Sequence, residues 1–133
     1  MVNYRLPREE ECVFLTTFLT NAMTGKTTRT KMALWDTGAA CSCVSRELAD
    51  FLALEKVGED TIDSATGSET ADVCRCIITL SPEDSFVRDV LVLPINDTPA
   101  IIGMDIIRVG HSQISPTEEG GIHFLFESQS SID

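Results

Sequence analysis

Short runs of β-branched and aromatic residues, separated by turn-forming residues, dominate the chain. Residues 12–20, 27–35, 73–80 and 86–93 each have the length and composition of a strand. Asn and Gly separate the first two runs, and Pro, Glu and Asp separate the second two, as expected for hairpin turns. The segment 111–126 also has the pattern of a hairpin, with Glu-Glu-Gly-Gly at its turn. The pattern predicts an all-β chain.

Helical spacing occurs in only two places. In residues 45–54, Leu48, Phe51 and Leu52 fall on one helical face, and Ser45 has a side chain suited to an N-cap. Residues 104–109 allow at most two turns, which Gly110 is expected to end. We therefore expect one or two short helices beside the strands.

Length, composition and charge limit the possible functions. A chain of 133 residues suits a single domain spanning 1–133, with no obvious linker or repeat. The net charge of −11 repels phosphate backbones and anionic lipids, so we expect neither nucleic acid nor a membrane as partner. No apolar run approaches the ~20 residues of a membrane span. The first residues also lack a signal-peptide pattern, which favours a cytoplasmic protein.

The five cysteines include two Cys-x-Cys pairs, Cys41 with Cys43 and Cys74 with Cys76. An odd number of cysteines without an export signal favours reduced thiols. Four thiolates could bind zinc, but zinc ligands usually have two or more residues between them. Small buried cysteines explain the pairs equally well. We expect no metal and no cofactor, and the role of the four cysteines stays open.

The segment 33–39 carries the strongest candidate for chemistry. An apolar run ends at Asp36, followed by Thr37, Gly38 and Ala39. The run can place a carboxylate at the floor of a cleft, and a glycine permits close approach of a ligand or a tight turn. Trp35 should point to the opposite face of the strand, into the core. Asp-Thr-Gly alone is equally suited to an ordinary turn, so a second signal is needed.

The second signal is Ile101-Ile102-Gly103, about 65 residues after Asp36 and directly before the second helical segment. Together the two segments resemble the retropepsin-like aspartic proteases, and look closest to stand-alone cellular or bacterial members. The likeness covers most of residues 11–127, with residues 62–70 where the family has its flap hairpin.

The resemblance implies a closed β-barrel with a flap hairpin, acting as a homodimer on peptide or protein substrates. It implies an endopeptidase in which Asp36 of each subunit shares one proton and activates a water molecule. The resemblance also implies that Thr37, Gly38 and Ala39 support the active site. It implies that Ile101, Ile102 and Gly103 form a strand threaded beside the active-site loop. The residues expected to contact substrate are Gly38 in the cleft and Ala65, Thr66 and Gly67 in the flap.

Two departures and several alternatives accompany the resemblance. Retroviral members carry an aspartate and an arginine where this chain has Ala40 and Met104. Because both charges are missing together, no buried ion is left unpaired, and we expect a different internal arrangement of side chains there. Asp105 is expected to lie in the first turn of a helix, where its negative charge interacts favourably with the helix dipole, rather than to catalyse. His111 and His123 fit surface or strand positions. The main alternative function is a catalytically silent module of the same fold, used for dimerisation or peptide binding.

Overall fold

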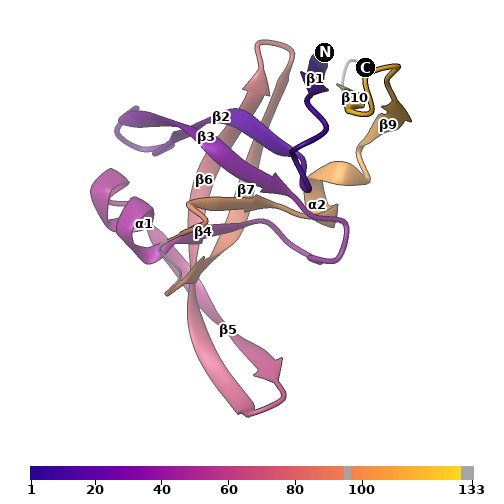
Figure 1. Ribbon diagram of the computed structural model, residues 1–133. Coiled ribbons are helices and arrows are strands. Elements are labelled where there is room, and N and C mark those ends of the chain that lie inside the picture. The colour runs from indigo at the N-terminus through magenta and orange to yellow at the C-terminus, as the bar shows by residue number, and fades with distance from the viewer. Residues whose placement is uncertain (95–96, 130–133) are drawn as a thin grey trace.

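A computed structural model describes residues 1–94 and 97–129 of the chain (Figure 1). The helices are α1 (Arg46–Leu52) and α2 (Met104–Ile107). The strands are β1 (Val2–Leu6), β2 (Phe14–Thr20), β3 (Thr27–Trp35), β4 (Cys43–Ser45), β5 (Lys56–Ser64), β6 (Gly67–Ser81), β7 (Asp84–Leu93), β8 (Ala100–Ile102), β9 (Gly110–Pro116) and β10 (Ile122–Ser128). The prediction of an all-β chain with short helices is confirmed.

Six strands form a closed barrel in the order β2-β3-β8-β4-β7-β6, because β2 pairs with both β3 and β6. Alternation of side chains along these strands fills the interior. In β2, Leu15 and Leu19 are fully buried, and in β6 Cys76 and Ile78 are almost fully buried. β3 and β8 run parallel, with Trp35 opposite Ile102. This parallel contact joins segments far apart in the sequence and places the end of β3 beside the end of β8.

The terminal strands form a separate three-stranded sheet, in the order β1-β10-β9. Sequence reasoning assigned no element to the first residues, and β1 is formed by pairing with β10. The sheet packs on the barrel through aromatic rings, since Trp35 lies edge-on to Phe124 and Phe126 at centroid distances of 4.8 and 5.2 Å. The prediction that Trp35 belongs to the core is confirmed.

Helix α1 begins where expected, because the Ser45 hydroxyl accepts a hydrogen bond from the Leu48 N–H at 3.1 Å. The expected apolar face is wrong in one detail: Phe51 is 56% exposed, whereas Ala49 and Leu52 are buried. The helix ends two residues before the sequence predicted, at Leu52. The cap residue Ala53 adopts φ +51°, and the buried Asn21 amide donates to the carbonyls of Leu52 and Ala53.

Helix α2 is a single turn, within the two turns that the sequence allows, but Gly110 does not end it. Arg108 is the C-cap in a right-handed conformation, and Gly110 is the first residue of β9. A Cβ at Gly110 would lie 2.6 Å from the Glu127 carbonyl oxygen and from the Phe126 ring. Glycine is therefore required there by the close approach of β9 to β10.

Strands β5 and β6 form the hairpin expected at the flap position, with the turn at residues 65–66. β5 lies outside the barrel, and Figure 1 shows the hairpin projecting at the end opposite the terminal sheet. Nearly every described side chain of the hairpin beyond Ala71 is exposed. In the described part of the chain, no helix is long and apolar enough to cross a membrane.

Candidate functional site

Asp36 follows β3 directly, and its backbone is held by the parallel neighbour β8. The Asp36 N–H donates to the Ile102 carbonyl at 2.9 Å, and the Ala39 N–H donates to the Asp36 carbonyl at 3.2 Å. The carboxylate accepts a hydrogen bond from the Gly38 N–H at 2.8 Å. These bonds make a tight turn in which the Asp36 side chain is half-buried, while Thr37 and Gly38 are exposed.

The segment after this turn crosses over Gly103 at backbone contact distance. A Cβ on Gly103 would lie 2.6 Å from both the carbonyl carbon and the oxygen of Cys41, and 2.9 Å from the Ala39 oxygen. The Met104 N–H donates to the Ala39 carbonyl at 2.8 Å. Glycine is required at this position because only a residue without a side chain lets the two segments touch.

A polar network near this crossing joins α2 to residues 36–42, which we call the Asp36 loop. The Asp105 carboxylate accepts from the Ser42 hydroxyl at 2.8 Å and from the Ser42 N–H at 3.0 Å. The hydroxyl oxygen of Ser42, which is fully buried, accepts from the Gly103 N–H at 3.0 Å. Arg88 donates from its guanidinium to the Asp105 carbonyl, with two contacts of 3.3 Å.

The missing charges at Ala40 and Met104 predicted another internal arrangement, and this network joins residues close to both positions, Ser42 and Asp105. Ala40 is exposed, and Met104 packs partly buried against the core. Asp105 lies in the first turn of α2, as expected, but its carboxylate also holds Ser42. Sequence reasoning missed Ser42 and Arg88. Ser42 lies between two cysteines and was overlooked beside them, and nothing local in the sequence links Arg88 to α2.

The structure brings together some of the residues expected at the site and keeps others apart. Asp36, Thr37, Gly38 and Ala39 form one turn, and it lies against Ile102 and Gly103, which are buried. Ile101 is half-buried in the middle of β8. The expected flap residues Ala65, Thr66 and Gly67 lie at the exposed tip of the hairpin. In Figure 1 this tip projects away from the barrel.

Burial raises the pKa of the thiols in both Cys-x-Cys pairs. Burial raises the pKa of Cys43 to about 12 and that of Cys76 to about 11. Burial also raises the pKa of Cys41, and the negative charges of Asp105 and Asp60 add to that shift. These thiols stay protonated at neutral pH. Among the described residues, no three His, Cys, Asp or Glu side chains are placed to hold a metal ion.

The fold is shared with solved aspartic proteases. A retropepsin-like aspartic protease from Rickettsia conorii aligns with a TM-score of 0.60 over 94% of this chain and 99% of that chain, at 14% sequence identity. The protease of simian foamy virus (mac) aligns with a TM-score of 0.52 over 72% of this chain and 92% of that chain, at 17% identity. No protein-family model and no curated protein matches the sequence. The chain has a retropepsin-like fold.

Proposed function

We propose that the protein is an aspartic endopeptidase, active as a homodimer, in which Asp36 of each subunit contributes one carboxyl group. The observation that carries this proposal is the placement of Asp36. Its carboxylate is half-buried, oriented by the Gly38 N–H, and adjacent to the exposed Thr37. The structural similarity to two aspartic proteases supports it.

Two subunits are required because the chain has one Asp-Thr-Gly. A two-fold axis brings the same loop of each subunit to the same place. Two carboxyl groups ~3 Å apart hold one proton between them, because both cannot easily ionise at that distance. The ionised Asp36 acts as general base on a bound water, and the protonated one donates to the carbonyl oxygen of the scissile peptide bond.

Replacing the carboxyl group tests the proposal. Asp36→Asn is expected to reduce cleavage of a mixed peptide library by at least about 10³-fold, because an amide cannot act as the general base. Asp89→Asn is the matched control, since Asp89 is half-exposed on β7 and pairs with Arg75. Circular dichroism and thermal unfolding would show whether both variants fold.

Mixing subunits separates a shared site from a site within one chain. At constant total concentration, an equal mixture of wild-type and Asp36→Asn subunits should retain about one quarter of the wild-type activity if only wild-type dimers are active. A site within one chain would retain about one half. If the wild type cleaves no peptide at any pH, yet dimerises and binds peptides, the silent binding module is the better description.

A further inference from the structure

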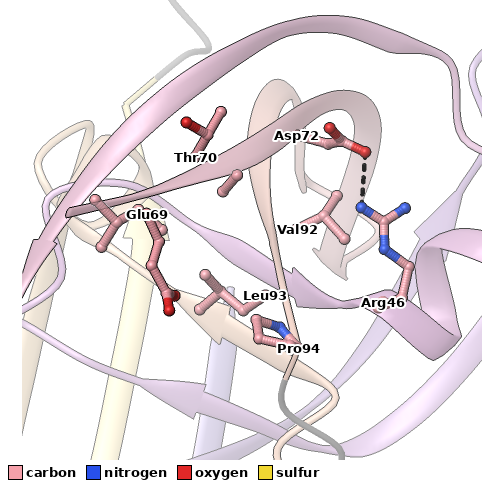
Figure 2. A pocket seen from close by; sticks show the side chains of 9 residues that line it. Arg46, Glu69, Thr70, Asp72, Val92, Leu93 and Pro94 are labelled. Carbon is pink, nitrogen blue, oxygen red and sulfur yellow. Dashed lines mark hydrogen bonds and ion pairs between the residues drawn. The ribbon is translucent and has the colours of Figure 1, made fainter. Parts of the chain in front are cut away.

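A pocket lies between the base of the flap hairpin, the end of β7 and the start of α1 (Figure 2). Its volume is about 340 Å³. Its walls are largely apolar, with Val92 buried and Leu93 half-buried. The residues that line it are Arg46, Ile62, Glu69, Thr70, Ala71, Asp72, Val92, Leu93 and Pro94. Such a site suits a side chain with an apolar stem.

The charges around the pocket are paired except for one. Arg46 binds Asp72 at 2.8 Å, and Lys56 binds the same carboxylate at 3.2 Å. Glu69 makes no ion pair within residues 1–94 and 97–129, and its cross-strand partner in β5 is the uncharged Ile62. Figure 2 shows the Glu69 carboxylate beside Leu93 and Pro94, on the other side of the pocket from the Arg46–Asp72 pair.

Strand β4 connects this pocket to the Asp36 loop. It begins two residues after Cys41, runs parallel to the end of β7, and leads directly into Arg46. Three strand residues span ~10 Å. The pocket therefore lies at the far end of the strand that follows the Asp36 loop.

Glu69 shares one face of the hairpin with Asp60 and Ala71. The pairs Asp60–Ala71 and Ile62–Glu69 are two residues apart in register, so their side chains share one face of the hairpin. Ala71 is buried, whereas its partner Asp60 and Glu69, which is nearer the tip, are exposed. The charge of Asp60 also acts on Cys41, in the segment that follows Asp36.

We propose that this pocket binds a basic side chain of the peptide substrate, with Glu69 contacting the lysine or arginine head group. The inference rests on the proposed function and names the substrate class for it. The apolar walls fit the methylene stem of such a side chain, while its charge reaches the carboxylate. The net charge of −11 favours basic peptides over acidic ones as well.

Cleavage of a peptide library tests the inference, with each position around the scissile bond carrying lysine, arginine, norleucine or glutamate. At one position, the wild type should cleave lysine and arginine peptides about fivefold more efficiently, in kcat/KM, than norleucine peptides. Glu69→Gln should remove this preference, and Glu69→Lys should reverse it toward glutamate. A screened charge contact also requires the wild-type preference to shrink in 0.5 M salt, about threefold the usual ionic strength.

Asp63→Asn is the matched control. It removes one negative charge from the same hairpin, but Asp63 lies on the opposite face, does not line the pocket, and accepts a hydrogen bond from Ser68. It should keep the lysine and arginine preference. The inference is overturned if the enzyme cleaves peptides but shows no basic preference, or if Asp63→Asn and Glu69→Gln change it equally. If the wild type and every variant fail to cleave any peptide, the result would instead count against the proposed function.

Discussion

The Asp36 loop and the β5–β6 hairpin are built in opposite ways. The loop is held by backbone contact at Gly103 and by the buried Ser42, which accepts and donates hydrogen bonds at the same time. The hairpin is largely exposed, and a Cβ on its Gly58 would meet no atom within 4 Å. Its hydrogen bond from Ser68 to Asp63 lies at the surface.

This difference matches what each region has to do in the proposed reaction. A general base must be held within a fraction of an ångström of its productive position, so the loop that carries it is fixed by packing and hydrogen bonds. A flap must move to admit a peptide, so it is drawn from a part of the fold with few buried contacts.

The largest expected contrast is between two glycine-to-alanine substitutions. Gly103→Ala should destabilise the fold by about 3 kcal/mol, because its Cβ would meet the Cys41 backbone at 2.6 Å. Gly58→Ala should be neutral or stabilise by about 0.5 kcal/mol, since the space is open and alanine restricts the unfolded chain. Urea unfolding measures both. Equal effects at the two sites would contradict the contrast.

The next contrast is between two serine-to-alanine substitutions. Ser42→Ala should cost about 2 kcal/mol, because it removes a donor to Asp105 and leaves the buried Gly103 N–H without its acceptor. Ser68→Ala should change stability by less than about 0.5 kcal/mol, because its partner Asp63 is exposed and can bind water. Thermal unfolding of the two variants against wild type gives the comparison, and a larger loss for Ser68→Ala would refute it.

The smallest contrast is between the pH dependence of stability at two aspartates, the buried Asp84 at the start of β7 and the exposed Asp63 in the hairpin. Asp84 is 1% exposed. Burial by itself would raise its pKa, but hydrogen bonds from Ser81 and Ser128 outweigh it, and the pKa lies below the ordinary value of 3.8. A lowered pKa stabilises the fold above pH ~4, and that stability is lost as the pH falls through the lowered value.

Asp84→Asn should therefore be less stable than wild type at pH 7, and the difference should shrink as the pH falls below ~4. The exposed Asp63 of the hairpin provides the control, because Asp63→Asn should unfold at nearly the wild-type denaturant concentration at both pH values. Urea midpoints at pH 7 and pH 3 measure the effect. A difference for Asp84→Asn that grows in acid would show that the sign is wrong.

Local patterns in the sequence were sufficient for the long strands of the barrel, the N-cap Ser45 and the all-β class, but not for β1 or the three-residue β4. Alternation of apolar residues reports burial directly, and turn residues mark where strands end. The same patterns misjudged Phe51 and Gly110. For Phe51, helical spacing alone does not show how much of the helix face the neighbouring strands cover. For Gly110, a glycine can be required by a close contact between strands as well as by a helix end.

The candidate site divides in the same way. Asp-Thr-Gly and Ile-Ile-Gly are readable as two segments, and their likeness to a known family placed them side by side. Ser42, Arg88 and Asp105 became a network only in three dimensions, because their contacts span 17 and 63 residues of sequence. The lack of an ion pair for Glu69 within residues 1–94 and 97–129 also depends on which neighbours the fold places around it.

By itself, the sequence determined where carboxylates, glycines and apolar runs occur, and hence where most of the longer strands form. The tertiary structure decided which of those segments touch: β1 with β10, β3 with β8, and the Asp36 loop with Gly103. The physical reason is that strand periodicity is a local property of the chain. Contacts between distant segments depend instead on how a closed barrel fills its interior, which no single window of the sequence contains.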